Sequence, residues 1–259
     1  MNLQTSELEK SRNLLVELGL EYAAEALLEL LERAVRENLS LVKFLELVTG
    51  KEVELREDRR VKSLLNSSGL PMGKTLNHFD FPFQRGVEKA KIDLLATCEF
   101  VKRKENVLLL GPPGVGKSHL AAGLGVKAAE NGFAVVFMNA DDLIDMLQKD
   151  EAVDHRKIRR RRYMNASLLI IDELGFQALD RHNAHLFFKV ISQRYERGSI
   201  IITSNKGIRE WPDILAGDEV LATAILDRLL HHCHVIQIDG RSYRLKHIEL
   251  GLHEGGEKS

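Results

Sequence analysis

The sequence is poor in the features that mark secreted and membrane proteins. Its 259 residues include only two cysteines, Cys98 and Cys233, and these form no metal-ligand pattern. No apolar run reaches the roughly 18 residues that a membrane-spanning helix requires. Residues 1–7 also lack the basic and apolar blocks of a signal peptide. We therefore expect a reduced, cytoplasmic protein with no membrane partner.

Net charge is almost absent as well. The chain has 37 Lys and Arg residues against 38 Asp and Glu residues, so its formal net charge of −1 does not point to a nucleic-acid partner. An apolar content of 44% with a charged content of 29% excludes wholesale disorder. The length allows one or two domains that bury a substantial core.

Apolar residues recur at helical spacing through the first 60 positions. This pattern predicts three or four short helices in an N-terminal region of residues 1–66, with Ser40 as an N-cap and Gly50 as a C-cap. A small self-contained bundle and a binding role both remain open for these helices. A cluster of turn-forming residues then predicts a linker over residues 67–76, and the tail 251–259 is expected to be disordered.

Residues 77–250 follow a different pattern. Short, continuous apolar runs alternate there with helical stretches. Such runs are typical of parallel strands that helices cover on both faces. The sequence therefore predicts one α/β domain with five strands, at residues 107–110, 134–138, 168–171, 200–203 and 234–238.

A glycine-rich motif follows the first predicted strand and matches G-x-x-x-x-G-K-[ST]. Its glycines let backbone N–H groups surround a β-phosphate, and the next helix adds the partial positive charge of its N-terminus. Lys117 is expected to reach the β- and γ-phosphates, and the Ser118 hydroxyl is expected to ligate Mg²⁺. We predict that ATP binds to Gly111, Pro112, Pro113, Gly114, Val115, Gly116, Lys117, Ser118 and His119.

Polar residues end the third and fourth predicted strands. Asp172 is expected to hold Mg²⁺ with Ser118, and Glu173 to polarise the water that attacks the γ-phosphate. A small-molecule kinase does not need the second carboxylate, so the pair favours ATP hydrolysis over phosphoryl transfer, and it argues against a non-catalytic ATP switch. Asn205 is expected to orient the same water or to contact the γ-phosphate.

Six positive charges fall within the eight residues 155–162. A solvated helix is the usual explanation of a charge run, but this density repels itself and suits a phosphate backbone better. Only Tyr163 adds an aromatic ring, which favours duplex over single-stranded DNA, with contacts independent of sequence. The predicted DNA-binding residues are Arg156, Lys157, Arg159, Arg160, Arg161 and Arg162.

Three further arginines are candidates for catalysis. Arg228 either pairs with a neighbouring acid or acts as an arginine finger on the γ-phosphate of a neighbouring subunit. Arg241 and Arg244 are candidates for a similar role within one chain. The consecutive residues 231–234 include three histidines and a cysteine, but they cannot all face one ion from a regular helix or strand. We expect no metal site there.

Together these motifs resemble those of AAA+ ATPases of the IstB/DnaC type, the initiator-related branch that includes helicase loaders and transposition helper proteins. The resemblance covers about residues 75–248. Residues 194–199 with 201–206, and residues 222–232, look more like IstB than like DnaC. IstB is the ATPase partner of the transposase in a family of bacterial insertion sequences. The matching stretches are residues 111–121, 168–175, 194–199 with 201–206, and 222–232.

The resemblance implies a P-loop AAA+ sheet of five strands in the order 5-1-4-3-2, after a helical N-terminal domain. It also implies homo-oligomers that form with ATP, through the nucleotide site, on duplex DNA, bend it, and present it to an IstA-like transposase. The alternative is a DnaC-like replicative helicase loader.

The resemblance further assigns roles to single residues. It implies Walker B roles for Asp172 and Glu173, sensor 1 for Asn205, and a trans-acting arginine at Arg228. The basic run falls where this branch carries an extra helix, associated with DNA contact, between the second and third strands. Arg244 is a possible sensor 2 residue, although no separate helical lid can be placed after the fifth strand.

Overall fold

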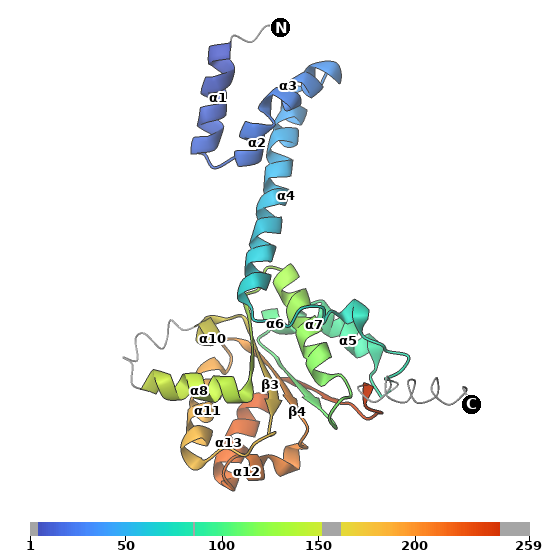
Figure 1. The fold of residues 1–259 in the computed structure, drawn as a ribbon, viewed down its shortest axis with the longest axis vertical. Helices are drawn as coiled ribbons and strands as arrows, with labels where there is room; N and C mark the ends of the chain where they lie inside the picture. The colour runs from blue at the N-terminus through green and yellow to red at the C-terminus, as the bar shows by residue number, and fades with distance from the viewer. Residues whose placement is uncertain (1–4, 85, 152–161, 244–259) are drawn as a thin grey trace, which may run out of the picture. The chain divides into compact units, whose positions relative to one another are not determined.

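The computed structural model describes residues 5–84, 86–151 and 162–243 (Figure 1). Contacts divide the chain into two units, residues 1–63 and 64–259; the domain boundaries expected from the sequence stay predictions. None of the helices in the described ranges combines the length and apolarity that a membrane crossing needs. Several predicted features lie outside the described residues, namely the tail 251–259, Arg244, and Arg156, Lys157, Arg159, Arg160 and Arg161 of the basic run.

The N-terminal unit is helical, and its last helix is longer than predicted. The predicted N-cap is confirmed, because Ser40 Oγ accepts a hydrogen bond from Lys43 N at 3.3 Å. The predicted helix end at Gly50 is wrong, because the helix continues through it. An interior glycine costs about 1 kcal/mol, and burial of the apolar side chain of Val48 in the same helix offsets this cost. The helices are α1 (Thr5–Glu17), α2 (Glu21–Glu25), α3 (Leu27–Arg36) and α4 (Leu41–Ser67), which extends past the limit of the unit.

Glu52 of α4 joins two helices of this unit. Its carboxylate is 1% exposed, and Oε2 accepts hydrogen bonds from the backbone N–H groups of Tyr22 at 2.9 Å and Ala23 at 3.4 Å. These are donors of the first turn of α2, whose N-cap residue Leu20 has no side chain that can accept them. Arg56 Nε lies 3.5 Å from Glu52 Oε1. A side chain of α4 therefore caps α2.

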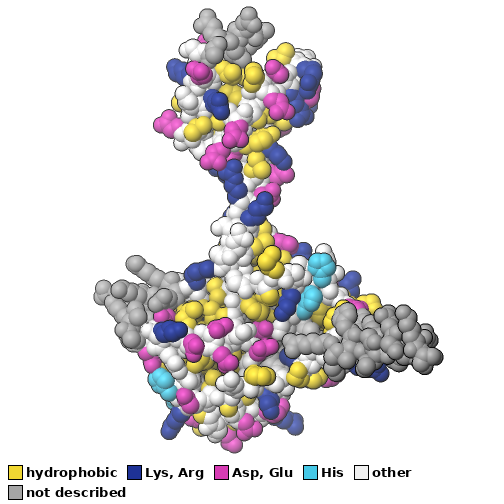
Figure 2. All heavy atoms as spheres, in the orientation of Figure 1, with side chains coloured by type: hydrophobic (Ala, Val, Ile, Leu, Met, Phe, Trp, Pro, Cys, Tyr) yellow, Lys and Arg dark blue, Asp and Glu magenta, His cyan; other side chains and the backbone are white. Residues whose placement is uncertain are grey.

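The surface of the N-terminal unit mixes apolar and charged side chains (Figure 2). Its core is small and is built around Ala23, Leu30 and Val48. Leu18 and Leu41, in contrast, are 71% and 83% exposed. A unit of this size cannot enclose all its apolar side chains, so these leucines face the solvent.

The second unit is built on five parallel strands. Its sheet order is β2-β3-β4-β1-β5, with every neighbouring pair parallel. This confirms the expected order 5-1-4-3-2, read from the opposite edge, and each strand coincides with a predicted apolar run. The strands are β1 (Asn106–Leu110), β2 (Val135–Asn139), β3 (Leu168–Leu174), β4 (Ser199–Ser204) and β5 (Cys233–Gln237).

Helices cover both faces of the sheet (Figure 1). Along β1, Val107 and Leu109 belong to one apolar cluster, whereas Leu108 and Leu110 belong to the other. This alternation is what a strand with two buried faces requires. The first cluster includes α5 (Lys89–Ala96), α6 (Glu99–Lys102) and α7 (Lys117–Glu130); the second includes α8 (Ala140–Glu151), α10 (Arg162–Asn165), α11 (Arg181–Arg194), α12 (Trp211–Ile214) and α13 (Glu219–Leu230).

The segment 67–76, expected to be a linker, contacts the sheet and α7. Phe137 N of β2 donates a hydrogen bond to Ser68 O at 2.8 Å. Gly69 has a φ of +75°, and a Cβ there would lie 2.8 Å from Phe137 O, so the close approach requires glycine. Leu76 begins the short 3₁₀ helix η1 (Leu76–His78) and is buried in the core beside α7. These contacts place the residues that follow η1 next to the start of α7.

Replacing Glu52 with Ala should loosen α2, because two backbone donors lose their acceptor and Arg56 loses its ion pair. We expect amide exchange in α2 to become about 5- to 30-fold faster, equivalent to about 1–2 kcal/mol. Hydrogen exchange of peptides from α2, followed by mass spectrometry, measures this directly. The control is Glu54→Ala, which removes only a surface ion pair with Lys51. Equal exchange rates in the two variants would contradict the capping role.

Candidate nucleotide-binding site

The glycine-rich loop connects β1 to α7. Gly114 and Gly116 have φ angles of +83° and +98°, a region that residues with a Cβ rarely adopt. A Cβ on Gly116 would also lie 2.6 Å from the ring of Phe79. The loop therefore needs glycine at both positions to turn into the N-terminus of α7, and the backbone N–H groups of a helix N-terminus favour an anion.

The side chain of Lys117 folds back over this loop. Its Nζ donates hydrogen bonds to Gly111 O at 2.7 Å and to Pro112 O at 2.8 Å. Both acceptors are neutral carbonyls in the loop itself. A phosphate oxygen carries more negative charge than a carbonyl oxygen and makes a stronger partner for an ammonium group. The amine is thus held at the loop that a phosphate group would enter.

Asp172 and Glu173 lie at the carboxyl end of β3, where the strand is irregular. The pairing with β4 shifts between Ile171 and Leu174, which is a β-bulge. Asp172 is buried, whereas Glu173 is exposed and has a φ of +62°. Because of the bulge, the two neighbouring residues lie in different environments, Asp172 in the interior and Glu173 at the surface.

Thr203 of β4 contacts both residues of this pair, and the sequence analysis did not identify it. Its hydroxyl donates to Asp172 Oδ1 at 2.5 Å and accepts a hydrogen bond from Glu173 N at 2.9 Å. Threonine is common in β-strands, so its presence in an apolar strand did not indicate a functional role. Its position two residues before Asn205 was the only hint.

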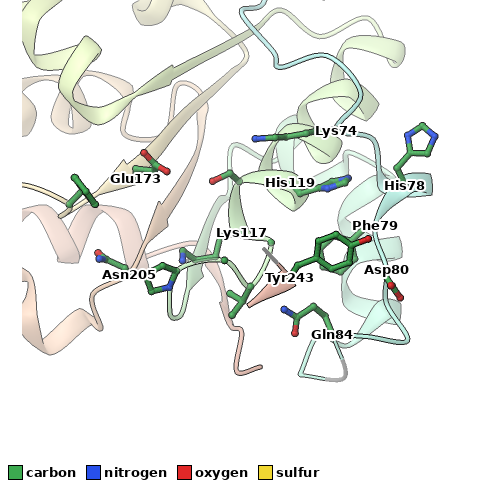
Figure 3. A pocket seen from close by; sticks show the side chains of 16 residues that line it. Lys74, His78, Phe79, Asp80, Gln84, Lys117, His119, Glu173, Asn205 and Tyr243 are labelled. Carbon is green, nitrogen blue, oxygen red and sulfur yellow. The ribbon is translucent and has the colours of Figure 1, made fainter. Parts of the chain in front are cut away.

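A cavity of about 330 Å³ brings most of the predicted residues together (Figure 3), but Asp172, Gly111 and Pro112 are not among the described residues that line it. Lys117 and Ser118 line it from the start of α7, Glu173 from the end of β3, and Asn205 from the loop after β4. In Figure 3, Glu173 and Asn205 lie on one side of Lys117, and Phe79 and Tyr243 lie on the other. The polar side is thus built from three strand ends, as parallel strands dictate. Of the predicted nucleotide-binding residues, Pro113, Gly114, Val115, Gly116 and His119 also line this cavity.

The aromatic side of the cavity comes from two segments that the sequence analysis left unassigned. Phe79 packs edge-to-face on His119, with 5.5 Å between ring centroids, and Tyr243 lies 5.4 Å from Phe83 in the same manner. Tyr243 N also donates to Gly114 O at 2.9 Å. The alternation of Phe79, Phe81 and Phe83 in the sequence was a signal that could have found this wall. Flat apolar rings beside a phosphate loop suit a nucleotide base.

Three predicted arginines lie away from the cavity lining. Arg228 Nη1 donates to Ala224 O at 2.7 Å, and its guanidinium lies 5.0 Å from the ring centroid of Phe188. Arg162, the one described residue of the basic run, donates a hydrogen bond to Ser67 O. The exposed Arg241 offers its backbone carbonyl to Gln84 at 2.9 Å. None of these three side chains is among the described residues that line the cavity.

The oxygen donors of the site fit Mg²⁺. Ser118 offers a hydroxyl at the start of α7, and Asp172 offers a carboxylate at the end of β3, which are hard ligands of the kind that this ion prefers. Thr203 occupies Asp172 Oδ1.

Comparison with known proteins identifies relatives over nearly the whole chain. The family model described as IstB-like ATP binding protein matches residues 13–250. The chain is 46% identical over 233 residues to the inferred ATP-binding protein of insertion sequence IS21 from Pseudomonas aeruginosa, which covers 90% of this chain and 88% of that protein. It is 42% identical over 229 residues to the corresponding protein of insertion sequence IS5376 from Geobacillus stearothermophilus, covering 88% and 91%.

Solved structures agree with the predicted fold class. DnaI superimposes with a TM-score of 0.55 at 21% identity, over 66% of this chain and 96% of that chain. DnaA from Aquifex aeolicus, bound to AMPPCP, gives 0.52 at 21% identity, over 74% and 58%. At this identity the likeness shows only the fold, which is that of P-loop AAA+ proteins.

Replacing Lys117 with Ala should weaken ATP binding at least 10-fold, because the loop loses the only ammonium group of its own sequence. Titration calorimetry with ATP measures the dissociation constant. The matched control is Lys127→Ala on the same helix, where the lysine pairs with Glu130 at 2.7 Å. The control should bind ATP as the unmodified protein does, and an equal loss in both variants would contradict the assignment.

Proposed function

The chain belongs to the IstB-like family of ATP-binding proteins and is an AAA+ ATPase, and from this premise we propose that it uses ATP to assemble on duplex DNA and to deliver that DNA to a transposase. The observation that carries the ATP chemistry is the single cavity that Lys117, Ser118, Glu173 and Asn205 share. The relatives at 46% and 42% identity are described as proteins of insertion sequences, which supports the transposition role.

In the proposed reaction, each polar residue predicted from the motifs has one task. Lys117 exchanges its two carbonyl partners for the β- and γ-phosphates. Ser118 and Asp172 hold Mg²⁺, which when bound offsets the charge of the phosphates. Glu173 accepts the proton of the attacking water, and Asn205 orients that water or contacts the γ-phosphate.

Arg228 is proposed to complete the site of a neighbouring copy. Its guanidinium is held by Ala224 O and by the ring of Phe188, and it does not line the described cavity of its own chain. A trans-acting arginine adds positive charge to the transition state only after subunits assemble. Hydrolysis would thereby depend on a homo-oligomer formed through the nucleotide site.

The basic run supplies the proposed DNA contacts. Its six charges, from Arg156 to Arg162, match a phosphate backbone, and the binding that they support does not depend on base sequence. An IstA-like transposase is the proposed recipient of the bound duplex. A helicase-loading role is not favoured, because the likeness to DnaI shows only the fold.

Replacing Glu173 with Gln should separate ATP binding from hydrolysis. The amide keeps the size of the side chain but cannot accept a proton, so we expect turnover to fall about 10²- to 10⁴-fold while the dissociation constant for ATP stays within about threefold. Phosphate release and nucleotide binding are measured on the same preparation. Unchanged turnover would sink the general-base role, whereas lost binding would mean that the substitution damages the cavity.

The experiment that tests the function is binding of the full chain to a labelled random-sequence duplex, with ATP, with ADP and without nucleotide. We expect cooperative binding to the duplex that depends on ATP, and weaker binding to a single strand of equal length. The same complexes, incubated with an IstA-like transposase, should direct insertion to the bound duplex. A preference for single strands, or co-purification with a replicative helicase, would instead favour the helicase loader.

A matched pair of charge variants locates the DNA contacts. Changing Arg159, Arg160 and Arg161 to Gln should weaken binding to all duplexes and reduce the slope of log K against log salt by about 0.9 for each lost phosphate contact. Changing the exposed Lys102, Arg103 and Lys104 to Gln removes the same charge elsewhere on the ATPase unit. Equal slopes in the two variants would contradict a specific role of the basic run.

A further inference from the structure

The end of β3 carries one residue more than the strand beside it. Ile171 pairs with Ile202 of β4, and the next paired residues are Leu174 and Ser204. Asp172 and Glu173 on β3 therefore stand opposite Thr203 alone on β4. A bulge of this kind interrupts the regular ladder and re-aims the side chains that it contains.

The Thr203 hydroxyl supplies the hydrogen bonds that the bulge lacks. It accepts a hydrogen bond from Glu173 N at 2.9 Å and donates one to Asp172 Oδ1 at 2.5 Å. A hydroxyl can do both at once, because it has one hydrogen and two lone pairs. Thr203 is fully buried and Asp172 is 5% exposed, so water does not compete strongly for the bond between them.

The backbone of Glu173 needs this support. Its φ of +62° lies in the left-handed region, which residues other than glycine avoid unless the surroundings hold them there. The N atom of Glu173, which belongs to this torsion, is the atom that donates its hydrogen to Thr203 Oγ1. Without the hydroxyl of Thr203, the N–H of Glu173 would lose this acceptor.

We propose that Thr203 is a positioning residue for ATP hydrolysis, which sets the directions of Asp172 and Glu173 with a single hydroxyl group. The inference rests on the roles proposed above for these two carboxylates. By fixing Asp172 Oδ1, Thr203 leaves the other carboxylate oxygen to act as a ligand. By holding the strained backbone of Glu173, it keeps that side chain facing the cavity that Lys117 and Asn205 line.

The next residue of β4 provides a matched comparison. Ser204 is also fully buried, and its Oγ donates to Leu174 O at 2.7 Å and accepts from Lys206 N at 3.1 Å. It closes the other side of the bulge with the same number of hydrogen bonds. Neither bond reaches a carboxylate, so the loss of Ser204 Oγ should affect stability and not the chemical step.

The test compares Thr203→Val, Thr203→Ser and Ser204→Ala in the full chain. Valine keeps the shape of threonine without the hydroxyl. We expect Thr203→Val to lower kcat about 10- to 100-fold, with KM for ATP and the dissociation constant of ATP within about threefold of the unmodified protein. Thr203→Ser should restore kcat. Ser204→Ala should lower the melting temperature without a comparable loss of kcat.

A double substitution shows whether Thr203 acts through Glu173. In a Glu173→Gln background, Thr203→Val should lower kcat clearly less than in the unmodified protein, since one of the two carboxylates that it positions is already disabled. An equal loss in both backgrounds would overturn the action of Thr203 through Glu173. So would an unchanged kcat in Thr203→Val, or equal losses of kcat in Thr203→Val and Ser204→Ala.

Two further controls keep the outcome decisive. If Thr203→Val does not fold, as judged by circular dichroism, Thr203→Ala replaces it and the same criteria apply. If Glu173→Gln alone hydrolyses ATP at the normal rate, the proposed base is wrong. The proposed positioning of Glu173 by Thr203 would then also be wrong, even if Thr203→Val hydrolyses ATP slowly. The single variants distinguish the two cases: a normal rate in Glu173→Gln contradicts the general base, whereas a normal rate in Thr203→Val contradicts the positioning role.

Discussion

The burial of a parallel sheet on both faces is the constraint on which the rest of the ATPase unit depends. Every residue of β1 is buried, and its side chains alternate between two apolar clusters. Chemistry that needs charge and water therefore has no place on either face. Because all five strands are parallel, their carboxyl ends share one edge, and the polar residues that follow β1, β3 and β4 meet there. The cavity is a direct consequence of this arrangement.

The sequence predicted this architecture well where the signal was local. Five continuous apolar runs became five strands because a strand with two buried faces needs nothing but apolar side chains. The order of the strands, in contrast, came with the family resemblance, since no periodicity encodes which strands pair. The glycine-rich loop was recognisable because its backbone requires glycine at Gly114 and Gly116 whatever surrounds it.

The features that the sequence did not predict depend on tertiary contacts. Gly50 has the local signature of a helix end, but packing around Val48 and Glu52 carries α4 through it. Thr203 gains its importance only from the shifted register of β3 against β4. The ring of Phe79 reaches the phosphate loop because the segment after α4 crosses α7, and this path is set by contacts far apart in the chain.

The position of Lys117 has a consequence for ligand selection. Its ammonium group already has two carbonyl acceptors in its own loop. Any anion that enters the loop therefore competes with these carbonyls for the hydrogen bonds of the ammonium group. A ligand with one weakly placed phosphate gains little from displacing them, whereas a polyphosphate chain offers several charged oxygens at once. We therefore expect the loop to favour ligands with several phosphate groups over ligands with one.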